Sequence, residues 1–240
     1  MEISESWLRE WVDPPVDSDT LISQLTMAGL EVEGWRSAAP KLVDVVVAEI
    51  VAVEKHPNAD KLNLCQVDDG NQQVAVVCGA GNVRAGLKVA FARVGAELPG
   101  IRIKKAKLRG IESQGMICSA MELQLAETSE GILELPADAP SGTSIVEYLS
   151  LADRIIDVDL TPNRGDCLSI AGVAREVSAI NRMPLTHSGV GEVADSISQS
   201  FAVELEAAEH CPRYAGRVIR GIDPQAHTPL WMQEKLRRCG

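Results

Sequence analysis

The stretch from residue 56 to residue 119 constrains the fold more than any other part of the chain. Short runs of Val, Ile, Leu and Ala recur in it at intervals of about ten residues, separated by Gly, Pro, Asn and Asp. This rhythm is typical of antiparallel strands joined by turns. Alternating strand and helix units would need a helical pattern between successive strands. The stretch therefore predicts an all-β barrel or sandwich and not a βαβ fold.

Basic charge is concentrated in the same stretch. The chain of 240 residues has a formal net charge of −11, whereas the segment from Arg84 to Arg109 contains eight Lys or Arg and one acid, a balance of 8 − 1 = +7. The eight basic residues are Arg84, Lys88, Arg93, Arg102, Lys104, Lys105, Lys107 and Arg109. A basic island on an acidic protein predicts one surface that faces a polyanion, and a small barrel with such a side is typical of oligonucleotide binding.

The directions in which these basic side chains point leave a second interpretation of the segment open. Neighbouring residues of a strand point to opposite faces, so Arg102 and Lys104 would lie opposite Lys105, Lys107 and Arg109 unless a bulge or a loop intervenes. The alternative to a binding surface is an ordinary solvated strand face.

Three further observations limit the chemistry. The only aromatic residues between positions 40 and 150 are Phe91 and Tyr148, so RNA binding there would depend on charge and loop shape more than on base stacking. His56 stands beside a proline in a turn and has no carboxylate or serine partner at a motif spacing, which favours a structural role. The six cysteines include no Cys-x-x-Cys pair, which predicts reduced thiols, mostly in the core, and no zinc site.

Helical patterns begin the chain. Apolar residues at helical spacing predict helices over residues 4–12 and 18–28, with Ser4 as the N-cap of the first and Gly29 as the stop of the second.

The pattern after residue 150 predicts a mixture of strands and helices. Residues 155–160 alternate apolar and acidic side chains, as a half-buried strand does, and Asp166 is the expected N-cap of a helix that ends near Asn181. The elements expected further on are strands at 201–205 and 213–222 and a helix capped by Thr228.

Several motifs resemble a known family. His-Pro-Asn-Ala-Asp-Lys-Leu at 56–62, Val-Cys-Gly-Ala at 77–80 and Arg-Gly-x-x-Ser-x-Gly-Met at 109–116 resemble the tRNA-binding OB domain of aminoacyl-tRNA synthetases. The flanking sequences at 6–12, 26–32, 161–169 and 172–176 resemble the N-terminus of the bacterial phenylalanine–tRNA ligase β subunit. The resemblance covers essentially the whole chain.

The resemblance implies an α+β fold in which an OB-fold β-barrel is inserted into a small α/β domain. The implied divisions are a split α/β domain at 1–39 and 151–185, a tRNA-binding OB domain at 40–150, a linker at 186–200, and the start of a truncated third α/β domain, in the editing region, at 201–240. This last division rests also on the small size of the final unit, whose two strands and one helix are too few to bury a core.

The candidate site residues combine the basic run with the loop motifs. Arg102, Lys104, Lys105, Lys107 and Arg109 are the expected RNA contacts, and Lys61 and Ser113 are further candidates. No residue is assigned to catalysis or to a metal, because the chain contains neither a Walker-type loop nor a nucleophile–base signature.

The remaining expectations concern the whole enzyme. By resemblance, it attaches phenylalanine to its tRNA using ATP and Mg²⁺ at a site on an α subunit, within an α2β2 heterotetramer. The N-terminus has no apolar signal sequence and no run is long and apolar enough to span a membrane, so a cytoplasmic location is expected. The alternatives are a stand-alone tRNA-binding or chaperone-like OB protein and a structural module that binds protein.

Overall fold

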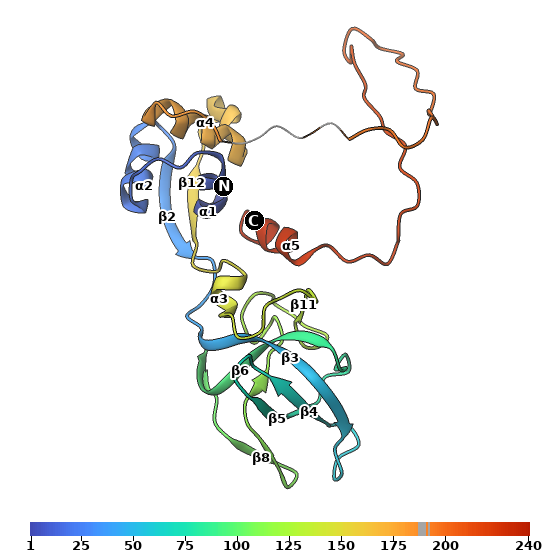
Figure 1. Ribbon diagram of the computed structural model, residues 1–240. Helices are drawn as coiled ribbons and strands as arrows, with labels where there is room; N and C mark the ends of the chain where they lie inside the picture. Colours follow the sequence, from blue (N-terminus) through green and yellow to red (C-terminus); the bar gives the residue numbers. More distant parts are fainter. Residues whose placement is uncertain (187–190, 192) are drawn as a thin grey trace.

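The computed structural model describes residues 1–186, 191 and 193–240 (Figure 1). Those residues form antiparallel sheets together with α-helices, which confirms the mixed α/β class expected from the sequence. No helix in the described part of the chain is long and apolar enough to cross a membrane.

A three-stranded sheet joins the two ends of the expected split unit. Its order is β1 (Glu2–Ser4), β12 (Arg154–Asp159) and β2 (Glu31–Ser37), all antiparallel. Helices α1 (Glu5–Trp11), α2 (Ser18–Met27) and α4 (Ile170–Asn181) share one apolar core with this sheet. The two helices expected at the start are confirmed, and Ser4 caps α1 by accepting a hydrogen bond from the Trp7 amide at 3.1 Å.

A seven-stranded sheet lies between β2 and β12 in the sequence. Its main path runs β10-β6-β3-β4-β5, and β7 and β11 also pair with β6. The bounds are β3 (Val43–Lys55), β4 (Asn63–Asp68), β5 (Gln73–Cys78), β6 (Leu87–Leu98), β7 (Ile101–Arg102), β10 (Met116–Ile117) and β11 (Glu134–Leu135). A separate hairpin is formed by β8 (Ala106–Leu108) and β9 (Ile111–Ser113), and the short helix α3 (Ile145–Tyr148) follows the sheet.

Burial on both faces explains the continuous apolar run in β3. Val45 and Val47 point into one core cluster, whereas Val46, Ala48 and Ile50 point into another. A strand that is covered on both sides needs apolar residues at every position, so β3 lacks the alternation of a half-exposed strand.

The start of α4 differs from the expectation. The helix begins at Ile170 and is capped by Ser169, whose Oγ accepts a hydrogen bond from the Gly172 amide at 3.0 Å. Residues Pro162–Cys167 form a 3-10 helix instead, η1. The assignment of Asp166 as N-cap was therefore wrong, because its carboxylate is held by Arg164 inside η1.

The strands expected at 201–205 and 213–222 were also wrong. Both segments are irregular and almost entirely exposed. A strand is stable only when a neighbour satisfies its backbone groups, and no strand in the described residues pairs with either segment. The last helix is confirmed as α5 (Leu230–Arg237), although Pro229 and not Thr228 occupies its N-cap position. Of the expected linker at 186–200, residues 187–190 and 192 lie outside the described residues, and the remainder is irregular.

Candidate nucleic-acid interface

The β8–β9 hairpin carries the centre of the basic run. Leu108 pairs with Ile111, so Arg109 and Gly110 form a two-residue turn. Both have positive φ angles, 48° and 96°, as a type I′ turn requires. Glycine adopts this conformation freely, whereas arginine does so only at a cost. The turn therefore presents Arg109 at the tip of the hairpin in a conformation that its own backbone disfavours.

The loop at 56–62 holds this tip in place. The His56 side chain is buried, with Nδ1 accepting from the Asn58 amide at 3.1 Å and Nε2 donating to the Leu108 carbonyl at 3.1 Å. This pattern requires the neutral ring with its proton on Nε2. Asn58 in turn donates from Nδ2 to the Arg109 carbonyl at 3.1 Å. His56 thus has the structural role that the sequence favoured, but its partner carbonyl lies 52 positions away and no local pattern indicates it.

The base of the hairpin is fastened by Ser113. Its side chain is 3% exposed; Oγ accepts from the Val77 amide at 3.1 Å and donates to the Gly115 carbonyl at 3.1 Å. The neighbouring Gln114 amide donates to the Ala75 carbonyl at 2.9 Å, which continues the attachment to β5. The structure argues against the RNA contact expected of Ser113, because its hydroxyl is buried and already bonded inside the protein.

Four of the eight basic residues of the island lie within ion-pair distance of carboxylates. The ion pairs are Arg84 with Glu134, Lys88 with Glu49, Arg93 with Asp44 and Asp69, and Lys105 with Glu112. Nε of Arg93 lies 2.7 Å from Oδ2 of buried Asp69. Burial alone would raise the pKa of the Asp69 carboxyl, but its bonds, including the one with Arg93, lower it. Arg84, Lys88 and Arg93 are therefore engaged by carboxylates within the protein. Less positive charge is free to bind a polyanion than the sequence count of +7 suggests.

The remaining candidates lie on or beside the hairpin. Arg102, Lys104, Lys107 and Arg109 are exposed and make no ion pair within the part of the chain that the structure describes. Lys105 is exposed and its contact with Glu112 is long, at 3.7 Å. Lys61 is exposed on the loop whose members His56 and Asn58 bind the hairpin tip.

The basic run is interrupted by an irregular segment at 103–105, so its side chains do not simply alternate between two faces of one strand. Ile103 is buried, its amide donates to the Ala96 carbonyl at 2.8 Å and its carbonyl accepts from the Gly95 amide at 2.8 Å. Lys104 and Lys105 follow it outside any strand, between β7 and β8. The run from 102 to 109 is therefore not one regular strand, and strict alternation does not govern its side chains.

The tip geometry predicts a stabilising substitution. Arg109→Asn creates the Asn-Gly pair that type I′ turns prefer, so we expect the free energy of unfolding to rise by about 1 kcal/mol. Thermal or urea unfolding measures this gain. The matched control is Arg102→Asn, at an exposed position of β7 with ordinary φ, where no gain is expected. Equal effects of the two substitutions would mean that Arg109 is not strained in solution.

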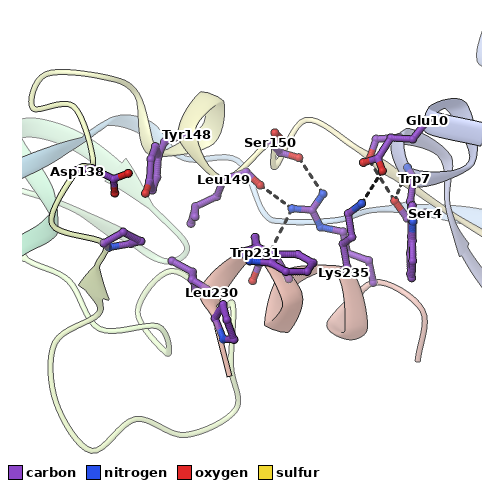
Figure 2. A pocket seen from close by; sticks show the side chains of 15 residues that line it. Ser4, Trp7, Glu10, Asp138, Tyr148, Leu149, Ser150, Leu230, Trp231 and Lys235 are labelled. Carbon is purple, nitrogen blue, oxygen red and sulfur yellow. Dashed lines mark hydrogen bonds and ion pairs between the residues drawn. The ribbon is translucent and has the colours of Figure 1, made fainter. Parts of the chain in front are cut away.

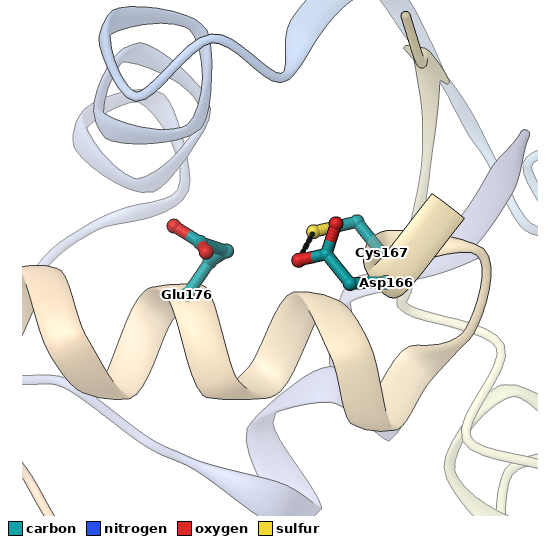
Figure 3. A group of neighbouring side chains, drawn as sticks. All are labelled: Asp166, Cys167 and Glu176. Atoms are coloured by element: carbon teal, nitrogen blue, oxygen red, sulfur yellow. Dashed lines mark hydrogen bonds between the residues drawn. The ribbon is translucent and has the colours of Figure 1, made fainter. Parts of the chain in front are cut away.

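A second cluster of side chains lies between η1 and α4 (Figure 3). The possible ligand atoms of Asp166, Cys167 and Glu176 lie within 4.8 Å of one another. Arg164 already binds all three: its guanidinium is 3.2 Å from Asp166, 2.7 Å from Glu176 and 2.9 Å from the Cys167 sulfur. Burial and the neighbouring carboxylates raise the pKa of the thiol, which keeps it protonated. Arg164 therefore connects η1 to α4 through these contacts.

Four of the six cysteines are buried, in agreement with the expectation that most lie in the core: Cys65, Cys78, Cys118 and Cys167. Burial raises the pKa of Cys65 and of Cys118 to about 12. Such thiols are poor nucleophiles and poor metal ligands at neutral pH.

Comparison with known proteins shows what the chain is similar to in sequence. Residues 45–144 match a family model described as "Putative tRNA binding domain". The whole chain is 56% identical over 241 aligned residues to the phenylalanine–tRNA ligase β subunit of Coxiella burnetii and 57% identical over 241 to that of Hahella chejuensis. Over its whole length, the chain is therefore similar to phenylalanine–tRNA ligase β subunits.

The alignments cover nearly all of this chain but only part of each relative. The chain spans 30% of the length of each of these two curated relatives, and the same holds for the β subunit of Pseudomonas putida, which is 56% identical over 239 residues. The β8–β9 hairpin and the loop at 56–62 both lie within the residues that match the tRNA-binding model.

Proposed function

We propose that this chain is the tRNA-binding and assembly part of the β subunit of a phenylalanine–tRNA ligase. The observation that carries the proposal is the identity of 56–57% along the chain to curated β subunits. The family model for tRNA binding, which covers the basic hairpin, supports the RNA contact.

The proposed domain division follows from the two sheets. Residues 40–150 form an OB-fold barrel inserted into a split domain at 1–39 and 151–185. In support, the strands of the three-stranded sheet come from both sides of the seven-stranded one, and the two sheets have separate apolar cores.

In the proposed complex, the exposed basic side chains of residues 102–109 bind phosphates of the tRNA, and Lys61 extends the surface. His56 and Asn58 hold the hairpin tip without touching RNA, since His56 is buried and the Asn58 amide is bonded to Arg109. Positive charges on a hairpin that is anchored at both ends lose less conformational freedom on binding than charges on a loose loop.

The wider enzyme is proposed by family resemblance. It attaches phenylalanine to tRNA(Phe) in the cytoplasm, uses ATP and Mg²⁺, and assembles with an α subunit as an α2β2 heterotetramer. In this arrangement, the chain supplies tRNA and assembly contacts, and the adenylate-forming site belongs to the α subunit.

Salt dependence tests the RNA contact. If about three to five phosphates are neutralised, log affinity for the tRNA(Phe) transcript falls with log salt at a slope of roughly −2 to −5. The triple substitution of Lys104, Lys105 and Lys107 by Glu should weaken binding about ten-fold or more and flatten the slope by about one unit for each lost contact. Electrophoretic mobility shift or fluorescence anisotropy over a salt series measures both quantities.

A charge-matched variant serves as the control. Arg175, Arg213 and Arg217 are exposed basic residues outside the hairpin, and their replacement by Glu changes the net charge by the same amount. We expect this control to retain most of the affinity. A flat salt response, or equal losses in the two triple variants, would contradict the RNA contact at residues 102–109. Either result would favour the protein-binding alternative, which the ion pairs of Arg84, Lys88 and Arg93 support.

A further inference from the structure

Helix α5 returns to the body of the protein after a long irregular segment. In the described part of the chain between α4 and α5, no helix or strand forms. Figure 1 shows α5 beside α1 and α3, between the helix-covered sheet and the seven-stranded sheet. Since nothing regular precedes α5, its own side-chain contacts must hold it there.

The chain passes between the two sheets twice, and α5 binds both crossings. The first crossing, residues 38–42, accepts a hydrogen bond at the Ala38 carbonyl from the Arg237 guanidinium at 2.8 Å. The second crossing, residues 149–153, accepts bonds from Arg238 at the Leu149 carbonyl, 2.6 Å, and at the Ser150 carbonyl, 3.0 Å. Two adjacent arginines thus hold the two connections on which the relative position of the sheets depends.

The charge of Arg238 is buried and balanced. The residue is 5% exposed, and its guanidinium lies 3.3 Å from the Asp153 carboxylate and 3.2 Å from that of Glu234. Asp153 also accepts from the Ser4 hydroxyl at 2.6 Å and from the Ser6 amide at 2.9 Å. The ion pair therefore connects α5 to the second crossing and to the start of α1. A buried guanidinium of this kind holds its geometry because any movement leaves a charge unpaired.

The two ends of α5 contact different parts of the protein. At the N-terminal end, Leu230 packs against the core cluster that contains Val45 and Val47 of the seven-stranded sheet. At the other end, the Lys235 ammonium pairs with Glu10 at 2.5 Å and lies 5.1 Å from the centre of the Trp7 ring, both on α1.

A cavity marks the junction between these contacts (Figure 2). It has a volume of about 530 Å³, and its lining includes Trp7 of α1, Tyr148 of α3 and Trp231 of α5. The three elements meet around this space without filling it. Helix α5 therefore borders an open space between α1, which packs on the three-stranded sheet, and α3, which follows the seven-stranded sheet.

We propose that α5 is a brace that sets the angle between the three-stranded and the seven-stranded sheet, with Arg237 and Arg238 as its positioning residues. Two chain crossings alone leave hinge motion as the default for neighbouring units. Ser150 in the second crossing has a positive φ of 51°, which is unfavourable for a residue with a side chain. A hinge rotation that moved Ser150 out of this conformation would lower its backbone energy. The brace concerns the internal geometry of the chain and does not depend on RNA binding.

Residual dipolar couplings of the intact chain test the brace without RNA. In the parent chain, backbone amides of both sheets should fit one alignment tensor. In the Arg237→Ala/Arg238→Ala variant, we expect two tensors of unequal magnitude, with faster hydrogen exchange of the α5 amides. The matched control, Arg213→Ala/Arg217→Ala, changes two exposed arginines of the irregular segment and should keep one tensor. The Arg237→Lys/Arg238→Lys variant, which retains charge but not the planar fork, should lie between them.

Removal of Arg238 leaves the buried carboxylates of Asp153 and Glu234 without this cation and can destabilise the fold. A second variant therefore keeps Arg238. Leu230→Ser/Arg237→Ala removes the contacts to the seven-stranded core and to the first crossing while keeping the ion pair with Asp153, and it should also give two tensors. One shared tensor in a variant whose α5 amides exchange freely would overturn the proposal, because the crossings alone would then set the angle. Retention of α5 in both variants would overturn it as well.

Discussion

The Gly115→Ala variant is expected to lose about 3 kcal/mol of folding free energy, because two separate costs add at this position. Gly115 has a φ of 134°, which side-chain-bearing residues rarely adopt. A Cβ atom there would lie 2.4 Å from Cζ of Phe91 and 2.7 Å from the Ala92 carbonyl oxygen. Phe91 is 1% exposed and packed in the core, so its ring has no free space to move into. Urea unfolding of the intact chain measures the loss.

Gly95→Ala separates the steric cost from the backbone cost. Gly95 also has a positive φ, 101°, but a Cβ atom there meets nothing within 4 Å. We expect this control to lose only the conformational part, about 1 kcal/mol. Equal losses of unfolding free energy in the two variants would mean that the Phe91 ring moves aside for the new methyl group. The positive φ alone would then be the reason for glycine at position 115.

These positions give the Arg-Gly-x-x-Ser-x-Gly-Met motif a physical meaning. Gly110 closes the hairpin turn, Ser113 fastens the hairpin to β5, and Gly115 lets the chain pass against Phe91. The motif therefore shapes and anchors the hairpin, while the exposed charges of residues 102–109 stand on it. Within this motif, Gly110, Ser113 and Gly115 shape and anchor the hairpin, and Arg109 is exposed at its tip.

The elements that the sequence predicted well are those with strong local signals. The segment from residue 56 to residue 119 is punctuated by glycines and turn residues, and the structure forms antiparallel strands in it, among them 63–68, 73–78 and 87–98. Helices α1 and α2 have both an apolar stripe and a capping side chain, Ser4 and Asp17. Local patterning of this kind acts through neighbours in the sequence, so it can be read without knowledge of the fold.

The errors arise where distant contacts decide. In the sequence, nothing distinguishes Arg84, Lys88 and Arg93 from the lysines at 104–107. Their carboxylate partners lie 50, 39 and 24 positions away. Ile103 interrupts the expected strand because it bonds with Gly95 and Ala96. The charge count predicted a basic surface, and only the folded chain reveals which charges are already neutralised.

The alternation at 201–205 and 213–222 was a correct description of the side chains and a wrong prediction of structure. Phe201, Val203 and Tyr214 are exposed by half or more. Alternation states which face of a strand would be apolar, but a strand exists only when an adjacent strand satisfies its amides and carbonyls. No such neighbour occurs among the described residues.

The second large effect is expected for Asp153→Ala, which should lower the free energy of unfolding by about 3 to 5 kcal/mol. The Asp153 carboxylate is 1% exposed and accepts hydrogen bonds from Ser4, Ser6 and Arg238. Its removal leaves two hydroxyls and part of a buried guanidinium without their acceptor, and each lost partner adds to the cost. Urea unfolding measures the total, and hydrogen exchange of the β12 amides reports where the loss occurs.

Asp157→Ala is the matched control, because Asp157 lies four residues further along, on β12, and also forms an ion pair, with the N-terminal ammonium at 3.3 Å. Its side chain is 49% exposed, and surface pairs of this kind contribute at most about 1 kcal/mol. A comparable loss in the two variants would show that Asp153 acts as an ordinary surface charge. A selective loss at Asp153 that also accelerates exchange in α5 would mean that one carboxylate stabilises both the start of α1 and the returning helix. The attachment of α5 would then be part of the stability of the three-stranded sheet itself.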